Sequence, residues 1–384
     1  MAHALNEYLR LAEPHLAPSL VSPTALEHIG HIARLLPPVT ASGFECRLGQ
    51  DEALADFGVR LLATDGSRAV LAGREGTDFS LSDSLRAHPV WERLRRFGAR
   101  WDEPGTLLHQ EIRDVFLEFD VDGAPPQVPI PSFFIEYARE ACRRLEALEE
   151  SLALLWGEPL APAVRARVVA CVEALPPEAR VSAVGAMFSR RFDGVRLCFH
   201  GLERDTLPDY LDRVGWPGER TALEALLARV ADRVERLTLC LDVGATVLPK
   251  VGVECHLAES LHEADSERWA MLLRRLVEHG LCLPAKRDAL LGWLGHTHTR
   301  SRPESLPGNL RALSARVGPD ALPVFLRRIN HLKLVLQPGQ PPEAKAYFAL
   351  IQRWLGYDGR SKRYVFGDLE EVREAVRGCV PPLS

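Results

Sequence analysis

The amino-acid sequence predicts an α+β fold in which repeated helix-helix-strand-strand (ααββ) units form a closed antiparallel β-barrel surrounded by helices. Pairs of segments with helical periodicity alternate with pairs of strand-like segments along the chain. Most of the strand-like segments have one apolar face and one polar face. A single ααββ unit cannot bury its own apolar strand face, so neighbouring units must share one sheet.

The composition is that of a globular protein with a sizeable core. The chain has 384 residues, of which 46% are hydrophobic and 26% are charged. The formal net charge of −5 gives no general attraction to nucleic acid or to an anionic membrane. We therefore expect neither as a partner, and any basic site must be local.

The eight cysteines form no CxxC pair, and several lie within apolar patterns, where a free thiol packs as a small hydrophobic group. The first 18 residues are predicted to form an amphipathic helix that contains charges, unlike a signal peptide. No apolar run approaches the length of a membrane span. These features favour a reducing, cytoplasmic location.

The first part of the chain, 1–131, follows the ααββ order only loosely. Periodicity and turn residues predict helices over 4–17, 24–36 and 84–101, and strands over 44–48, 58–62, 68–72 and 115–120. A proline-rich connector over 124–131 follows the last of these strands.

Three clearer repeats follow, over 132–202, 203–257 and 258–350, so the sequence predicts one domain over 1–384. The predicted helices cover 132–156, 162–175, 206–214, 219–235, 265–279, 284–294 and 307–317, with a C-terminal helix over 367–377. The predicted strands cover 181–188, 194–202, 237–243, 250–257, 330–337 and 343–350.

The two faces of the strands allow two arrangements. In 250–257, for example, Lys250, Glu254 and His256 lie on one face, opposite valine, cysteine and leucine side chains. An open sheet could expose such a polar face to water. A closed barrel could instead enclose the polar side chains and a ligand. The helix pairs between successive hairpins favour the barrel, because so many helices would crowd one face of an open sheet.

The last predicted hairpin carries a short motif, Lys345-Ala346-Tyr347. With the ααββ repeats, this resembles the ABBA or PT-barrel fold of soluble aromatic prenyltransferases, including indole prenyltransferases of the dimethylallyltryptophan synthase type. Those enzymes bind a prenyl diphosphate on inward Lys and Arg side chains, often in a Lys-x-Tyr motif, and tyrosines shield the allylic cation.

The resemblance implies transfer of a prenyl group to an aromatic, amide or peptide acceptor in specialised metabolism. The co-substrate is then a prenyl diphosphate; no further cofactor is implied, and Mg²⁺ is possible but not required. The residues expected to bind the diphosphate are Lys250, Lys333, Lys345, Arg60 and Arg196.

Prenyl transfer also needs groups that handle the cation and a proton. An aromatic face stabilises a carbocation, and Tyr347 is the predicted group. A carboxylate that orients an acceptor N–H can accept its proton, and Glu118 and Glu254 are the predicted bases. Asp120, His256 and His331 are expected in the cavity wall.

Other motifs point to no second chemistry. Asp120-Val121-Asp122 is better explained as a turn than as a glycosyltransferase metal motif, and His296 and His298 have no third metal ligand nearby in the sequence. No DDxxD, GxGxxG, P-loop, GxSxG or HExxH motif occurs. We therefore predict no metal ligands. The alternative to an enzyme is a non-catalytic binding or partner protein of a biosynthetic pathway that holds a peptide on the polar sheet face.

Overall fold

The computed structural model describes residues 4–74, 81–139, 144–190, 194–230, 232–257, 264–298, 306–317, 321–358 and 361–377. Its central feature is one antiparallel sheet of 12 strands, in the order β12-β11-β1-β2-β3-β4-β5-β6-β7-β8-β10-β9. A further pairing of β10 with β11 joins the two sides of this sheet into a ring. The predicted closed barrel is therefore confirmed, and β9 and β12 extend the sheet beyond the ring.

The ring consists of ten strands. They are β1 (Ala41–Arg47), β2 (Ala55–Leu62), β3 (Ile112–Phe119), β4 (Ser132–Tyr137), β5 (Arg180–Ala186), β6 (Val195–His200), β7 (Arg236–Val243), β8 (Val247–His256), β10 (Ala321–Leu336) and β11 (Glu343–Asp358). The two added strands are β9 (Gly295–His298) and β12 (Arg363–Gly367).

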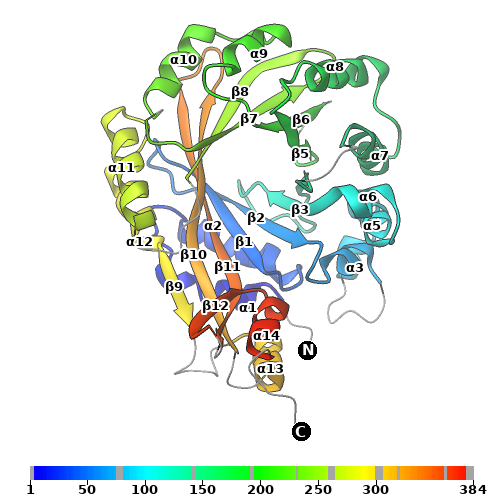
Figure 1. Cartoon of the computed structure of the whole chain (residues 1–384), viewed down its shortest axis with the longest axis vertical. Coiled ribbons are helices and arrows are strands. Elements are labelled where there is room, and N and C mark those ends of the chain that lie inside the picture. The colour runs from blue at the N-terminus through cyan, green and yellow to red at the C-terminus, as the bar shows by residue number, and fades with distance from the viewer. Residues whose placement is uncertain are drawn as a thin grey trace.

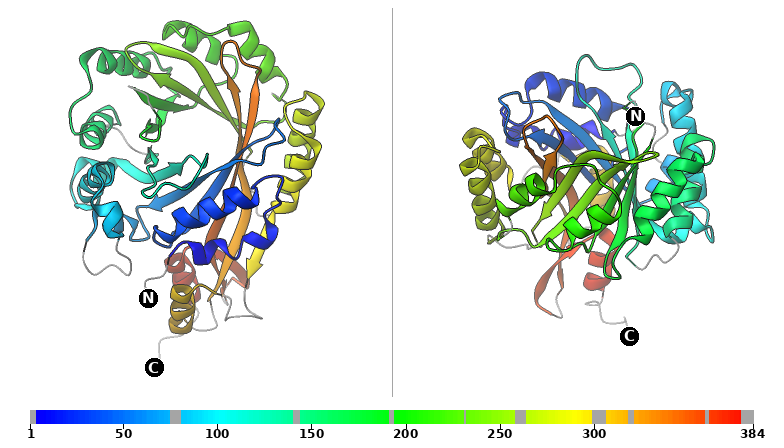
Figure 2. Two further views of the ribbon diagram at one scale, coloured as in Figure 1. Left: turned by 180° about the vertical axis from the view of Figure 1, so that it is seen from behind. Right: turned by 90° about the horizontal axis from the view of Figure 1, so that it is seen from above.

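Helices lie outside the barrel on several sides (Figures 1 and 2). They are α1 (Asn6–Leu9), η1 (Glu13–His15), α2 (Pro23–Arg34), α3 (Ser67–Ala72), α4 (Asp83–Arg86), α5 (Pro89–Asp102), α6 (Leu107–Glu111), α7 (Arg144–Trp156), α8 (Pro162–Glu173), α9 (Leu207–Arg213), α10 (Arg220–Ala228), α11 (Ala264–Glu278), α12 (Pro284–Trp293), α13 (Gly308–Val317) and α14 (Leu369–Arg377). No helix in the described ranges is both apolar enough and long enough to cross a membrane.

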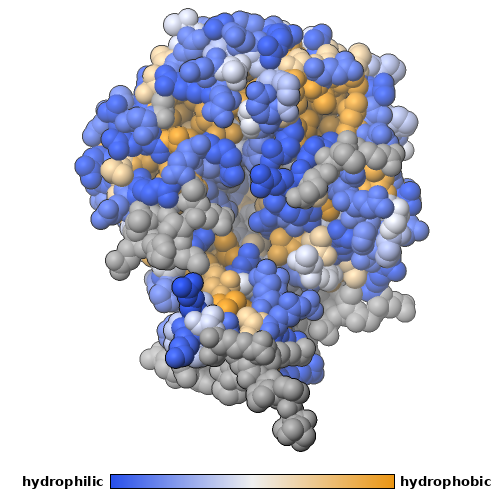
Figure 3. All heavy atoms as spheres, viewed as in Figure 1, coloured by the Kyte–Doolittle hydropathy of each residue, from blue (hydrophilic) through white to orange (hydrophobic). Residues whose placement is uncertain are grey.

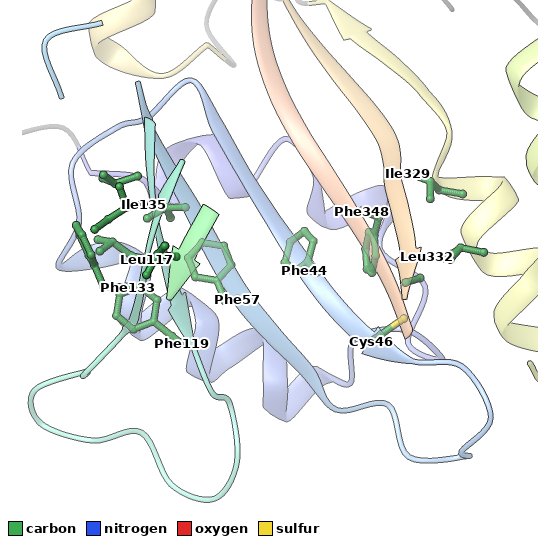
Figure 4. Close-up of a cluster of buried hydrophobic side chains, with 14 of the residues drawn as sticks. Phe44, Cys46, Phe57, Leu117, Phe119, Phe133, Ile135, Ile329, Leu332 and Phe348 are labelled. Atoms are coloured by element: carbon green, nitrogen blue, oxygen red, sulfur yellow. The ribbon is translucent and has the colours of Figure 1, made fainter. Parts of the chain in front are cut away.

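The hydrophobic core lies between the outer face of the barrel and the helices. Phe44, Phe57, Leu117 and Phe133 belong to successive strands of the ring, and all four side chains are buried together (Figure 4). Phe44 stacks on Phe348, with 5.1 Å between ring centroids. Because side chains alternate along a strand, packing these residues outward turns their polar neighbours into the barrel.

Buried tryptophans of α5 join the helix layer to β3 and to the connector before β4. The Trp91 indole N–H donates to the Pro129 carbonyl at 2.9 Å, and the Trp101 indole donates to the Ile112 carbonyl at 3.1 Å. Each pair satisfies a buried polar group while the ring fills the core.

Two predicted elements, the strand 68–72 and the helix 132–156, are wrong. The predicted strand 68–72 is α3, which lies between Gly66 and Gly73, both in the left-handed region at φ 81° and 69°. A short apolar run does not distinguish a strand from a buried helical turn. Gly98 allows α3 to pack closely against α5, because a Cβ at this position would lie 2.8 Å from the backbone of α3.

The segment 132–156 is also not one helix. Ser132–Tyr137 forms strand β4, and α7 begins at Arg144. Five of the six β4 residues are buried, so the strand has no polar alternation to reveal it. β4 pairs with β3, so this hairpin extends past residue 131, where the first part of the chain was expected to end.

Smaller differences concern element ends. The predicted helix 4–17 is two short pieces, α1 and η1, and the predicted helix 84–101 is divided into α4 and α5 before Pro89. Strands β10 and β11 are each 16 residues long and extend well beyond the predicted hairpin. Strands β9 and β12 and helix α6 were not predicted.

Candidate active site

One pocket inside the barrel is lined by charged side chains from seven strands. Its lining residues are Glu45, Glu118, Arg190, Arg196, Cys240, Asp242, Lys250, Gly252, Lys333, Val335, Lys345 and Tyr347. Six of the predicted site residues are among them: Glu118, Arg196, Lys250, Lys333, Lys345 and Tyr347. The barrel therefore gathers, on its inner face, residues that are up to 302 positions apart in the chain.

Two lysines of this pocket are direct cross-strand partners. Lys333 of β10 lies opposite Lys345 of β11. The Lys333 ammonium lies 3.2 Å from Glu254 Oε1 and 3.4 Å from Cys240 Sγ. The Lys345 ammonium donates to Glu45 Oε1 at 2.5 Å. The charge of each lysine is thus balanced by a carboxylate on the other neighbouring strand: Glu254 on β8 for Lys333, and Glu45 on β1 for Lys345.

Gly252 of β8 makes room for Lys333. A Cβ at Gly252 would lie only 2.6 Å from Lys333 Cε. Because a strand favours residues with larger side chains, glycine here is explained by the close approach of the lysine chain.

Lys250 has no ion pair among the described residues, in contrast to Lys333 and Lys345. Burial and the nearby cations Arg196 and Lys345 lower its pKa, and only Asp242 acts in the opposite direction among the main contributors. An anion in the pocket would relieve this repulsion.

Two arginines complete the cationic wall. Arg196 of β6 lies opposite Asp242 of β7 and holds it with two hydrogen bonds, at 2.7 and 3.0 Å. Arg190 pairs in the same bidentate way with Asp120, at 2.6 and 3.2 Å, and Ser189 also donates to this carboxylate at 2.7 Å. Asp120, predicted as cavity wall, is therefore the partner of a pocket arginine.

Two inner carboxyl groups differ in charge state. Burial and the charge of Glu45 raise the pKa of Glu118 to about 7. Burial would also raise the pKa of Glu45, but Lys345 and a hydrogen bond from Tyr347 lower it to about 2. Glu118 has no ion-pair partner within the described ranges. It is thus the carboxyl group of the pocket that can take up or release a proton near neutral pH.

Three further predicted residues, Glu254, His256 and His331, form a cluster beside Lys333. The rings of His331 and Tyr347 stack, with centroids 4.2 Å apart, and the His256 ring lies 5.0 Å from His331. Glu254 lies between them, 3.5 Å from His256 Nε2 and 3.9 Å from His331 Nε2. Of the described residues, Glu254, His256 and His331 are the set whose donor atoms are close enough to hold one metal ion.

Arg60 lies apart from the pocket. Its guanidinium pairs with Asp114 and Glu136 and lies 5.3 Å from the centre of the Phe116 ring. Phe116 faces Phe134 across β3 and β4. The two phenylalanines add inward aromatic surface that was not predicted from the sequence.

Sequence reasoning also missed Glu45, Asp242 and Arg190. Period-two alternation places Glu45 between Phe44 and Cys46, and Asp242 between Leu241 and Val243, so the inward direction of both could have been found. Arg190 follows β5 in a loop, where no periodicity applies. Its contact with Asp120 depends on the fold alone.

Little free space remains between these side chains. The pocket has a volume of about 30 Å³, which is room for about one water molecule. A larger hollow of about 200 Å³ is lined by residues 201–204, Leu227, Val230 and 234–237, and it contains none of the predicted site residues. Most of the surface coloured in Figure 3 is hydrophilic, with hydrophobic patches between the hydrophilic regions.

Comparison with known proteins supports the fold but gives no close relative. No family model matches the sequence, and no curated protein matches it. Among solved structures, AnaPT from Neosartorya fischeri matches with a TM-score of 0.51 and 12% identity, over 90% of each chain. The apo form of prenyltransferase PriB matches with a TM-score of 0.50 and 16% identity, over 90% of this chain and 96% of PriB.

The closed ten-stranded antiparallel barrel with helices outside is the PT-barrel, or ABBA, fold. The chain shares this fold with PriB along nearly the full length of both proteins. The resemblance inferred from the ααββ repeats and the Lys-x-Tyr motif is therefore confirmed at the level of the fold.

Proposed function

We propose that this protein transfers a prenyl group from a prenyl diphosphate to an aromatic acceptor. The observation that carries the proposal is the inner cationic wall, and within it Lys250, which has no counter-charge of its own in the described structure. Five lining residues are cationic and converge on one pocket from β6, β8, β10, β11 and the loop after β5. The shared fold with a solved prenyltransferase supports the same function.

In this proposal the lysines and arginines bind the diphosphate and stabilise it as it leaves. Charge-assisted hydrogen bonds from Lys250, Lys333 and Lys345 neutralise the leaving group, so a metal ion is not required for this step. Tyr347 lines the pocket, and the ring face that is not stacked on His331 is the one proposed to face the allylic cation. The inward Phe116 and Phe134 extend the aromatic surface.

Glu118 is the proposed proton acceptor. Its pKa of about 7 lets it accept a proton from the acceptor as the new bond forms. Glu254 is less suited to this role, because His331, Lys333 and His256 outweigh its burial and hold its pKa well below the usual range.

Calorimetry with dimethylallyl and geranyl diphosphate, without added metal, tests the proposal. We expect one site per chain and at least tenfold weaker binding for Lys345→Ala, a loss of about 1.4 kcal/mol. Turnover is then measured with tryptophan, other indoles and tyrosine as acceptors. Absence of binding across prenyl chain lengths would overturn the proposal.

One observation favours a second candidate function, a non-catalytic binding or partner protein. The ion-paired side chains leave only about 30 Å³ free, so a ligand must displace some of them to enter. A binding protein of this kind would show no turnover with any acceptor and would co-purify with a peptide or protein. Turnover of a prenyl diphosphate would exclude it.

A further inference from the structure

We propose that Glu254, His256 and His331 form a binding site for one Zn²⁺ ion, or a similar first-row divalent metal, inside the barrel. The proposal goes beyond the prenyl transfer suggested above and does not depend on it. It also differs from the expectation, drawn from the sequence, that the two histidines serve only as cavity wall. In the sequence the three residues are separated and match no metal motif, because the third ligand comes from another strand.

The barrel strands bring the three side chains together. Glu254 and His256 are two positions apart on β8, so both project from the same, inward face. β10 pairs with β8 through Leu332 and Cys255, which places His331 beside His256. Two ligands from one strand and a third from its neighbour therefore converge by ordinary sheet geometry.

The spacing of the donor atoms suits a small metal ion. One donor atom of each residue lies within 4.8 Å of the others. Glu254 Oε2 is 3.5 Å from His256 Nε2, and Glu254 Oε1 is 3.9 Å from His331 Nε2. In a tetrahedral zinc site with bonds of about 2.0–2.2 Å, neighbouring donor atoms are about 3.4 Å apart. Rotations of the side chains would complete this geometry, and His256 Nε2 would exchange its 3.0 Å contact with Thr238 Oγ1 for the metal.

An unsatisfied nitrogen supports the site independently of the clustering. His331 Nε2 is buried and has no hydrogen-bond partner in the described structure. A buried polar atom without a partner is costly, and a metal ion at this position would satisfy it. The atom points toward Glu254, and stacking of the His331 ring on Tyr347 holds it in this direction.

The chemistry of the donors selects the kind of metal. Imidazole nitrogen with carboxylate oxygen suits Zn²⁺ and neighbouring transition metals, whereas Mg²⁺ prefers oxygen ligands and water. Three protein ligands leave a position free for water or an anionic oxygen.

Lys333 is the main opposing charge, since its ammonium lies 3.2 Å from Glu254 Oε1. The lysine contacts one carboxylate oxygen, and the other faces His256. The carboxylate can therefore contact the lysine and the metal at the same time. Further cations of the pocket, Arg190, Arg196, Lys250 and Lys345, lie in the same interior, and Asp120, Asp242 and Glu45 pair with three of them.

The test is metal binding by the full-length protein, measured without any prenyl substrate. The protein is stripped with a chelator and titrated with Zn²⁺ by calorimetry, and Co²⁺ is used as a spectroscopic probe of coordination. We expect one Zn²⁺ per chain, a Co²⁺ spectrum of low coordination number, and no competition from Mg²⁺. Zn²⁺ should also raise the melting temperature of the wild type, because it binds the folded state.

His331→Ala and Glu254→Gln should each weaken Zn²⁺ binding by at least about 100-fold, the upper end of the loss caused by removing an outer-shell partner. His296→Ala is the matched control, because His296 and His298 stack on exposed β9 and could bind a metal at the surface. Its Zn²⁺ affinity should equal that of the wild type. Loss of binding in His296→Ala, or a wild type whose affinity and melting temperature ignore Zn²⁺, would overturn the proposal.

Failure of the metal test and failure of prenyl diphosphate binding are separate results. The first is measured with the metal alone, and the second with a diphosphate alone. If His331→Ala does not fold, Glu254→Gln and the Zn²⁺-dependent melting of the wild type still decide the question.

Discussion

Lys333 and Lys345 are direct cross-strand neighbours inside the barrel, and each contacts a carboxylate on its outer side. Like charges in this position destabilise a sheet unless counter-charges offset them. Glu254 and Glu45 supply those counter-charges from β8 and β1. Each lysine therefore has its own carboxylate partner. Both ammonium groups line the same pocket, where one anion could bridge them.

Replacing Lys250 should separate ligand binding from stability. Lys250→Met removes a cation that repels Arg196 and Lys345, so the melting temperature without ligand should rise. Binding of inorganic pyrophosphate should weaken about 10- to 100-fold, as expected for one lost charge-assisted hydrogen bond. Calorimetry and thermal unfolding measure the two effects. Arg311→Ala, which removes an exposed cation on α13, is the control and should leave pyrophosphate binding unchanged.

Gly252→Ala tests the packing of Lys333 across β8. The new Cβ would lie 2.6 Å from Lys333 Cε, so the lysine must move away from Glu254. We expect a loss of about 1–3 kcal/mol in the free energy of unfolding, typical of overpacking. Urea unfolding checks this value. Gly58→Ala, another glycine on a barrel strand, has no neighbour closer than 3.8 Å and should cost much less; equal losses would contradict the account.

Glu118→Gln should change the pH dependence of stability. Burial raises the pKa of Glu118 from 4.5 to about 7, so the folded state holds its proton more tightly than the unfolded state. The wild type consequently loses stability as the pH rises from about 4.5 to about 7. Glutamine removes this loss, so the variant should be more stable than the wild type at pH 8 and equal to it at pH 4.

Thermal unfolding across this pH range measures the difference. Glu203→Gln, at an exposed position, should follow the wild-type profile. A Glu118→Gln variant whose stability difference does not depend on pH would show that the carboxyl group is not perturbed.

Phe348→Ala tests the core between barrel and helices. Phe348 is 1% exposed and contacts the rings of Phe44 and Trp293. Truncation should cost about 3–5 kcal/mol in the free energy of unfolding. Tyr364→Ala removes a ring that is 73% exposed and should change it by no more than about 0.5 kcal/mol. Urea denaturation of both variants gives the comparison.

The barrel and its inward residues were predictable because alternation along a strand is a local property. Lys250, Lys333, Lys345 and Tyr347 all lie opposite apolar positions in the sequence, and all line the pocket. Strand β4 escaped prediction for the converse reason, since burial of both of its faces removes the alternation.

The counter-charges were harder to predict. A glutamate in a strand, such as Glu45, looks the same in the sequence whether it faces water or a lysine 300 positions away. Arg60 was predicted to bind the diphosphate because its strand face points inward. In the structure its guanidinium instead forms ion pairs with Asp114 and Glu136. The periodicity of a strand predicts whether a side chain points into the barrel. Predicting its ion-pair partner requires the strand register of the whole barrel.

Closure of the ring through β1 and β11 has a consequence for biosynthesis. β1 ends at Arg47, and its partner begins at Glu343, so the nascent chain must extend through β11 before the two strands can pair. Until then one edge of β1 has no strand to pair with. Pairing between strands so far apart in the sequence makes folding slow. The Lys345–Glu45 contact forms in this same step. The charged interior is thus completed only after the ribosome has synthesised β11.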